Sequence, residues 1–125
     1  MKLLLDTHVV LWALGSPERL TPAARKVLQE PEHVIFASAV SAWEIEIKRA
    51  IGKLDAPDDL LEQLALLRFS ELPLRLTHVR ALSRLPAHHP DPFDRMLVAQ
   101  AAAEDLVFVT RDRRMRSYPI RCLAA

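Results

Sequence analysis

The run Leu3-Leu4-Leu5-Asp6-Thr7, close to the first residue of the chain, decides the fold. Three consecutive leucines without a polar interruption are typical of a strand that is buried on both faces, as inner strands of parallel sheets are. The run ends on a carboxylate, and open α/β sheets place their chemistry in the crevice outside the carboxyl ends of the strands. We therefore expect Asp6 to stand at a functional edge of a sheet.

Two later runs repeat this pattern. Val34-Ile35-Phe36 and the segment 106–109 are short, apolar and rich in β-branched or aromatic residues, which predicts two more buried strands. The stretch from Leu72 to Leu76 is ambiguous, and it suits at most an edge strand because Pro73 has no N–H to donate to a neighbour. A last extended segment is expected within 120–123.

Helical patterns fill the segments between these strands. They are expected over 9–14, 22–28, 42–51, 58–67, 79–85 and 92–103. Thr21-Pro22 and Asp91-Pro92 each combine an N-cap residue with proline at the first helical position. The spacing of Ser41 and Glu44 is that of a capping box. Helices that alternate with buried strands predict an α/β fold, with a central and mainly parallel sheet covered on both faces.

Composition bounds the class of protein. A length of 125 residues suits a single domain over 1–125, and 50% hydrophobic residues with a net charge of +1 indicate neither disorder nor a general polycation. The apolar start is interrupted at Asp6, far short of the roughly 20 apolar residues of a spanning helix. The one cysteine, Cys122, has no partner for an internal disulfide. We expect a cytoplasmic protein without a membrane segment.

Several enzyme classes are disfavoured by the sequence. The chain has only 2 glycines and therefore no Gly-rich loop that could cradle the phosphates of a nucleotide cofactor. Phosphotransferases of the haloacid dehalogenase type end their first strand in Asp-x-Asp, but His8 occupies the second position here. Response-regulator receivers carry a lysine after their last strand, where this chain has Arg111.

Four acids occupy comparable places along the predicted topology. Asp6 follows the first strand, Glu44 lies in the first predicted turn after the second, Asp94 opens the apolar helix 92–103, and Asp112 follows the third strand. In a right-handed parallel arrangement these positions share one edge of the sheet. Gathered carboxylates repel one another unless a hard cation such as Mg²⁺ or Mn²⁺ is bound through oxygen. The pattern predicts a divalent-metal site.

Each acid also has a purely structural interpretation. Asp6 could simply end a strand, and Asp94 occupies about the third position of its helix, where the dipole favours any acid. Glu44 could belong to the capping box or form an ion pair one turn along the helix with Lys48. Asp112 could serve a turn or pair with a neighbouring arginine. No single structural role explains four acids at one edge, so we favour the functional interpretation.

Three further polar residues adjoin these acids. Asp91 is accounted for as the N-cap before Pro92, and it also lies one turn before Asp94, so we assign it a secondary place in the site. Thr7 and Thr110 each follow or precede a proposed ligand and could orient a carboxylate or a metal-bound water, with helix capping as the alternative.

Histidines and arginines add weaker indications. His88 and His89 precede the apolar helix, but adjacent histidines without a third fixed partner are poor indications of zinc, so we expect solvated loop residues. Arg111, Arg113 and Arg114 crowd the segment around Asp112. Positive charge beside an acidic metal site would attract a polyanionic phosphodiester. A solvated arginine-rich face is the alternative.

Four motifs follow one another over nearly the whole chain. They are Leu4-Leu5-Asp6-Thr7-His8, Ser41-Ala42-Trp43-Glu44-Ile45, the segment from Asp91 to Ala101, and Val109-Thr110-Arg111-Asp112. As a set they resemble the PIN-domain ribonucleases, and most closely the VapC-type toxins of bacterial and archaeal toxin–antitoxin pairs. The acidic quartet of that family falls on the four acids that the topology brings to one edge.

The resemblance implies a three-layer α/β/α domain that cleaves RNA with Mg²⁺ or Mn²⁺. It also implies a homodimer and inhibition by a cognate antitoxin, with a toxin–antitoxin hetero-oligomer as the alternative assembly. Our hypothesis is an endoribonuclease in which a divalent ion activates water, with Asp6 as the central ligand, Asp94 and Asp112 completing the shell, and Glu44 binding an ion or orienting the water. The rival is a non-catalytic PIN-like module that binds protein or RNA. That rival predicts the loss of at least one acid, whereas all four are present.

Overall fold

The structure is a computed structural model that describes residues 1–125. Its five strands form one sheet in the order β3-β2-β1-β4-β5, and every pair of neighbours is parallel. The strands are β1 (Lys2–Leu5), β2 (Val34–Ser38), β3 (Ser70–Leu72), β4 (Val107–Thr110) and β5 (Cys122–Ala124). The leucine run therefore forms the central strand, as its lack of polar residues predicts.

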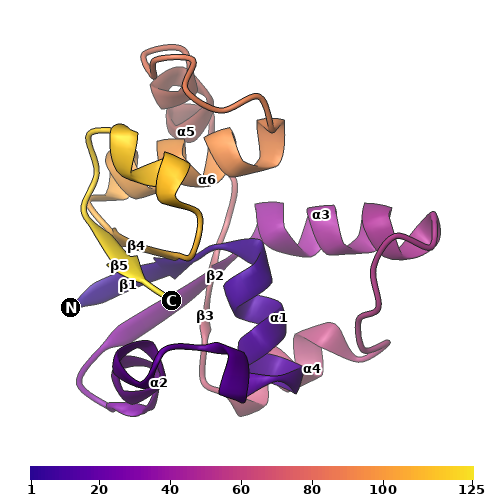
Figure 1. The fold of residues 1–125 in the computed structure, drawn as a ribbon. Coiled ribbons are helices and arrows are strands. Elements are labelled where there is room, and N and C mark those ends of the chain that lie inside the picture. Colours follow the sequence, from indigo (N-terminus) through magenta and orange to yellow (C-terminus); the bar gives the residue numbers. More distant parts are fainter.

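Helices cover both faces of this sheet (Figure 1). They are α1 (Thr7–Gly15), α2 (Pro22–Gln29), α3 (Ala39–Ala50), α4 (Leu60–Leu66), α5 (Leu76–Leu82) and α6 (Pro92–Glu104), with the short 3₁₀ helices η1 (Pro17–Arg19) and η2 (Arg113–Ser117). In Figure 1, α5 and α6 lie above the sheet, and α1, α2 and α4 lie below it. The predicted three-layer α/β/α fold is confirmed. None of the helices has the length and apolar character needed to cross a membrane.

The pleat of β1 sends its leucines into both layers. Leu3 and Leu5 pack with Val9 in the core that α1 and α2 cover, whereas Leu4 packs with Leu97 in the core beneath α6. All three leucines are fully buried. A shift of β1 by one residue would exchange the two sets between the cores, so this packing fixes the register of the strand and the position of Asp6 at its end.

The start of α3 corrects the sequence-based prediction. Ser38, the last residue of β2, accepts a hydrogen bond from the backbone N–H of Val40 at 3.0 Å, and the helix begins at Ala39. The predicted capping box of Ser41 and Glu44 is therefore wrong, because a serine earlier in the chain already caps the helix. Glu44 lies in the second turn of α3 instead of the first.

Smaller differences occur around β3. The edge strand ends at Leu72, before Pro73, instead of running from 72 to 76. Helix α5 begins at Leu76, and its first turn is held by His78, whose Nδ1 accepts the backbone N–H of Arg75 at 3.0 Å. Within the stretch 72–76 that was ambiguous in the sequence, residues 73–75 are thus a connection that leads directly into a helix.

Candidate active site

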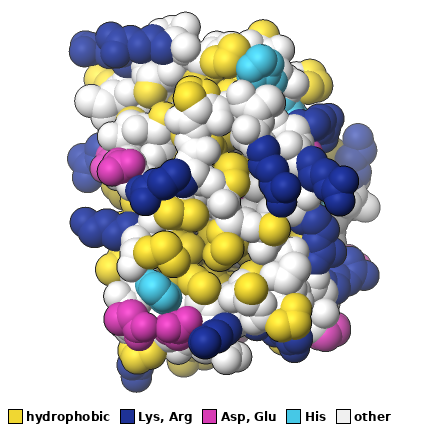
Figure 2. Space-filling view, turned by 60° about the vertical axis from the view of Figure 1, so that its left-hand side comes forward, with side chains coloured by type: hydrophobic (Ala, Val, Ile, Leu, Met, Phe, Trp, Pro, Cys, Tyr) yellow, Lys and Arg dark blue, Asp and Glu magenta, His cyan; other side chains and the backbone are white.

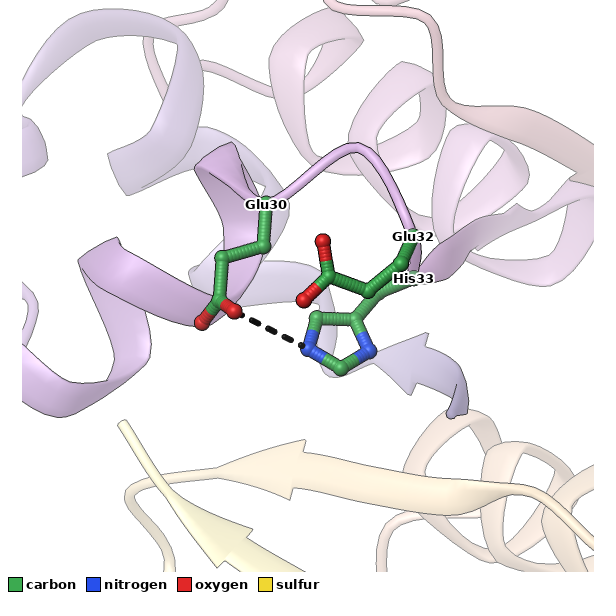
Figure 3. A group of neighbouring side chains, drawn as sticks. All are labelled: Glu30, Glu32 and His33. Atoms are coloured by element: carbon green, nitrogen blue, oxygen red, sulfur yellow. Dashed lines mark ion pairs between the residues drawn. The ribbon is translucent and has the colours of Figure 1, made fainter.

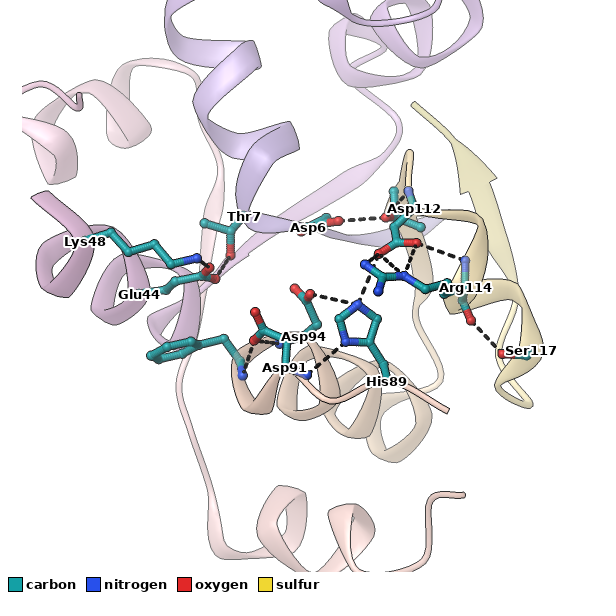
Figure 4. Close-up of polar contacts among 12 residues, drawn as sticks. Asp6, Thr7, Glu44, Lys48, His89, Asp91, Asp94, Asp112, Arg114 and Ser117 are labelled. Atoms are coloured by element: carbon teal, nitrogen blue, oxygen red, sulfur yellow. Dashed lines mark hydrogen bonds and ion pairs between the residues drawn. The ribbon is translucent and has the colours of Figure 1, made fainter. Parts of the chain in front are cut away.

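Three of the four predicted acids face one hollow at the carboxyl ends of β1 and β4. Asp6 follows β1, Asp112 follows β4, and Asp94 projects from the first turn of α6 (Figure 4). They line a hollow of about 450 Å³, together with residues of the rim and walls, which are His8, Val9, Trp12, His89, Asp91, Arg111 and Arg114. Because β1 and β4 are direct neighbours in register, residues after their ends are brought together.

Asp6 is held from the neighbouring strand. Thr110 Oγ1, at the end of β4, donates a hydrogen bond to Asp6 Oδ2 at 2.7 Å, and the backbone N–H of Asp6 donates to the carbonyl of Val109 at 3.0 Å. Asp6 stands at the N-cap position of α1, yet its side chain makes no capping hydrogen bond. Burial raises the pKa of this carboxyl, the Thr110 hydrogen bond partly opposes that rise, and the charge of Glu44 adds to it.

The pKa of the Asp94 carboxyl is also raised, and by a large amount. Burial first, and then the negative charges of Asp6, Asp91, Glu44 and Asp112, raise the pKa of Asp94 to about 7. The neighbouring Asp91 caps α6 as predicted, since its Oδ1 accepts the backbone N–H groups of Phe93 at 2.8 Å and of Asp94 at 3.2 Å. The cap fixes the first turn of α6 and with it the position of Asp94.

Asp112 has a different environment on the open side of the hollow. Its Oδ1 accepts the backbone N–H of Arg114 at 2.9 Å, and its Oδ2 accepts the Arg114 side chain Nη2 at 2.9 Å. These contacts, chiefly the Arg114 side chain, lower the pKa of Asp112 to about 2. Asp112 therefore serves a turn and pairs with an arginine, as the structural alternative predicted. The same residue also faces the hollow.

Glu44 lies beside the hollow without lining it. Its carboxylate is buried, accepts a hydrogen bond from Thr7 Oγ1 at 2.7 Å, and forms an ion pair with Lys48 one turn along α3. Thr7 Oγ1 also approaches Ser41 Oγ at 3.0 Å. Each threonine thus holds one carboxylate, Thr110 that of Asp6 and Thr7 that of Glu44, and the ion pair considered as the alternative for Glu44 is formed.

His89 is a member of the cluster that the sequence did not predict. Only 5% of its surface is exposed, and its Nε2 lies 3.2 Å from Asp112 Oδ2 and 3.4 Å from Asp94 Oδ2. The expectation of two solvated histidines is correct for His88, which is exposed and stacks edge-on against Tyr118, and wrong for His89. The one local indication of its burial is its position two residues before Asp91, the N-cap of α6. The backbone N–H of Asp91 donates to His89 Nδ1 at 3.0 Å.

The three arginines predicted to bind substrate have separate environments. Arg111 stacks its guanidinium 4.3 Å from the centre of the Trp12 ring and donates from Nε to the carbonyl of Ala125 at 3.1 Å. Arg114 pairs with Asp112, and Arg113 is exposed and does not line the hollow. Figure 2 shows that on the face it views, lysine and arginine side chains are spread around an apolar area. Positive charge is thus not confined to the site.

The PIN domain family model matches residues 3–120 of the chain. This chain belongs to the PIN domain family. Among characterised relatives, Ribonuclease VapC22 of Mycobacterium tuberculosis is 32% identical over 130 residues, which cover 92% of this chain and 90% of the relative. The resemblance to VapC-type PIN domains that the four motifs indicate is confirmed.

Solved structures share the PIN domain fold at low sequence identity. VapBC2 from Rickettsia felis bound to a promoter DNA fragment aligns with a TM-score of 0.73 at 14% identity, over 99% of this chain and 98% of that one. DNA-bound VapBC from Salmonella typhimurium aligns with a TM-score of 0.73 at 19% identity and the same coverage. These likenesses show that the entire α/β/α arrangement is common to the three chains.

The donor set of this PIN domain fits a hard divalent cation. Carboxylate oxygens of Asp94 and Asp112 lie within 4.8 Å of each other and of a ring nitrogen of His89, and the Asp6 carboxylate lines the same hollow. Carboxylate oxygens are the ligands that Mg²⁺ and Mn²⁺ prefer, and the raised pKa values of Asp6 and Asp94 indicate a place where added positive charge is favoured.

A second group with comparable spacing lies at the opposite end of the sheet. Glu30, Glu32 and His33 occupy the turn between α2 and β2, and their ligand atoms also lie within 4.8 Å of one another (Figure 3). Glu32 is exposed, and His33 Nε2 contacts Glu30 Oε2 only at 3.8 Å. This group stands before a strand, away from the edge where the other acids meet.

Proposed function

We propose that this PIN domain is an endoribonuclease that depends on Mg²⁺ or Mn²⁺ and that acts as the toxin of a type II toxin–antitoxin pair. The observation that carries the proposal is the convergence of Asp6, Asp94 and Asp112 on one hollow. A relative supports the proposal, since the chain is 32% identical to Ribonuclease VapC22 over about nine-tenths of both chains.

The catalytic assignment follows from the contacts of each acid. A bound divalent ion lowers the pKa of water and stabilises negative charge on a phosphate. We assign the holding of that ion to Asp6, Asp94 and Asp112, whose carboxylates face the hollow. The Thr110 hydroxyl fixes the rotation of Asp6, because its hydrogen bond of 2.7 Å ties the carboxylate to β4.

Glu44 has a separate role in this proposal. Thr7 donates a hydrogen bond to its carboxylate, and Lys48 forms an ion pair with it, at the side of the hollow. A carboxylate held in this way can orient a water molecule and accept its proton. Its burial behind Thr7 favours that role over direct contact with an ion.

The substrate side of the proposal rests on charge. Arg111 and Arg114 stand at the rim of an acidic hollow, where their guanidinium groups can contact the phosphates that flank the scissile bond. Attack by water, and not by the ribose 2′-hydroxyl, leaves a 5′-phosphate and a 3′-hydroxyl. Detection of a 2′,3′-cyclic phosphate in the products would contradict this route.

We further propose an antitoxin and a second copy of the chain as partners. Large apolar side chains are exposed on three helices and at the end of one of them, namely Trp43 and Ile47 of α3, Ile51 directly after α3, Leu61 and Leu66 of α4, and Leu76 and Val79 of α5. Exposed apolar surface of this extent is typical of protein interfaces. The structural relatives from Rickettsia felis and Salmonella typhimurium are VapBC assemblies, in keeping with this proposal.

The test is cleavage of a defined RNA pool by the purified chain. We expect cleavage with Mg²⁺ or Mn²⁺, none with EDTA, and a loss on the order of 10²- to 10³-fold in Asp6→Asn, which keeps the shape of the side chain but removes its charge. Circular dichroism checks that the variant is folded. Equal cleavage by Asp6→Asn would remove Asp6 from the mechanism. Failure of the folded, metal-supplied chain to cut any RNA would favour a binding module.

A further inference from the structure

The imidazole of His89 lies between two carboxylates that come from different elements. Asp94 belongs to the first turn of α6 and Asp112 to the connection after β4, and His89 Nε2 is 3.4 Å and 3.2 Å from their respective Oδ2 atoms (Figure 4). The ring is almost fully buried. A side chain so enclosed cannot rotate away without leaving both contacts.

The hydrogen bond on the other side of the ring determines where its proton is. The backbone N–H of Asp91 points at His89 Nδ1 at 3.0 Å, and a backbone N–H can only donate. Nδ1 must therefore offer its lone pair, which excludes the tautomer protonated at Nδ1 and also the imidazolium, which carries protons on both nitrogens. The remaining form is the neutral ring with its proton on Nε2, which donates to Asp112 Oδ2 at 3.2 Å and lies 3.4 Å from Asp94 Oδ2.

We infer that His89 is a positioning residue of the carboxylate site, one that donates from Nε2 to the Asp112 carboxylate, lies against the Asp94 carboxylate and aligns the two for a divalent ion without being a ligand. The inference rests on the proposed function, since it concerns the same site. A metal-bound imidazole needs a lone pair on Nε2, and the Asp91 amide denies His89 that form. The ligands of the site are then all oxygens, which favours Mg²⁺ and Mn²⁺ over zinc.

This role explains why the helix cap and the site are built together. Asp91 uses its side chain to cap α6 and its backbone N–H to fix His89. The cap therefore sets both the start of the helix that carries Asp94 and the orientation of the ring that lies between the Asp94 and Asp112 carboxylates. Groups that orient metal ligands in this way typically contribute 10- to 100-fold to metal affinity.

The test measures Mn²⁺ binding to the full chain by electron paramagnetic resonance of the free ion. We expect His89→Ala to weaken binding about 10- to 100-fold. His89→Gln should stay within about threefold of the wild-type chain, because its side-chain amide still donates at a similar distance from the backbone. His88→Ala is the matched control, since the adjacent His88 is exposed and makes no contact with the carboxylates, and it should bind Mn²⁺ unchanged.

A second measurement covers the case in which His89→Ala fails to fold. The ¹⁵N resonances of the wild-type ring should show a protonated Nε2 and an unprotonated Nδ1, both before and after addition of diamagnetic Mg²⁺. Loss of the Nε2 proton on addition of Mg²⁺ would overturn the inference, as would a folded His89→Ala that binds Mn²⁺ like the wild type or a His89→Gln no better than alanine. Absence of Mn²⁺ binding by the wild-type chain would instead overturn the proposed function itself.

Discussion

Two groups of carboxylate and imidazole side chains lie at opposite ends of the same sheet, with similar spacing and different surroundings. The first, Glu30, Glu32 and His33, comes from four consecutive positions in one turn. The second joins His89, Asp94 and Asp112 from three separate elements, with Asp6 in the same hollow. Spacing alone does not distinguish these two groups.

Burial and convergence distinguish them. Of the two glutamates of the turn, Glu32 is exposed and Glu30 is partly exposed, so water screens their charges and their proximity costs little. The aspartates of the hollow are partly or fully withdrawn from water, and three separate segments of chain must fold to bring them together. Such an arrangement is costly without a function that uses the charge, because repulsion between buried carboxylates opposes folding. The separation of residues along the chain is therefore as informative as their distance in space.

The largest expected difference between the two groups is in cleavage. Asp94→Asn should reduce RNA cleavage on the order of 10²- to 10³-fold, because it removes one charge from the proposed ion site. Glu30→Gln is the matched control, a change of the same kind in the exposed turn, and it should cleave at the wild-type rate. Both are measured with the same RNA and metal. A comparable loss in Glu30→Gln would abolish the distinction between the groups.

The pH dependence of stability is the next largest effect. The pKa of Asp94 is raised in the folded chain to about 7 from 3.8, so the folded state holds a proton that the unfolded state releases. The stability that this proton contributes is fully present below about pH 4 and is lost as the pH rises through about 7. Asp112 has a lowered pKa of about 2 and acts only in the more acidic range between that value and 3.8.

Thermal denaturation with EDTA checks this expectation. The melting temperature of the wild-type chain should fall relative to that of Asp94→Asn between pH 5 and pH 8, because asparagine cannot ionise. Allowing for partial exposure of the carboxylate, we expect a relative change of about 2 kcal/mol, which corresponds to several degrees. Mg²⁺ at pH 8 should restore part of the loss in the wild type only. Parallel pH curves for the two proteins would contradict the assigned shift.

Much of the fold was predictable from local features. The leucine run, the β-branched run 34–36 and the Asp91-Pro92 cap act through nearest neighbours and period, and each produced the expected element. The start of α3 was not predictable, because Ser38 and Ser41 are both competent caps. The choice between them depends on where β2 ends, which its pairing with β1 and β3 determines.

The candidate site likewise has residues whose positions were predictable from the sequence and residues whose positions were not. The topology of parallel strands is sufficient to bring Asp6, Asp94 and Asp112 to one edge, whatever the side chains do in detail. The direction of Glu44 depends on Thr7 and Lys48, and the burial of His89 depends on carboxylates from distant segments. Neither could be predicted from spacing, since neighbouring histidines have the same local sequence and only the packing around them differs.

A smaller effect on stability is expected at the ion pair beside the hollow. Lys48→Met should destabilise the fold by about 1–2 kcal/mol, because it leaves the buried Glu44 carboxylate without its cation while Lys48 itself is one-third exposed. Arg49→Met is the matched control on the next residue of α3. Arg49 pairs with Glu46, which is open to water, and its loss should change the melting temperature less. Equal effects would show that burial of Glu44 is not the cause.

The smallest effect is expected from neutralising both glutamates of the turn between α2 and β2. The double variant Glu30→Gln with Glu32→Gln should melt within about 2 °C of the wild type, because the charges lost are screened by water and touch no buried carboxylate. The increase in melting temperature that Mn²⁺ produces should also be unchanged, whereas Asp6→Asn should reduce it. The titration is most decisive at low Mn²⁺, where only the tighter site is filled. If the double variant loses the Mn²⁺ effect and Asp6→Asn keeps it, the ion binds in the turn, and burial is not what separates the two groups.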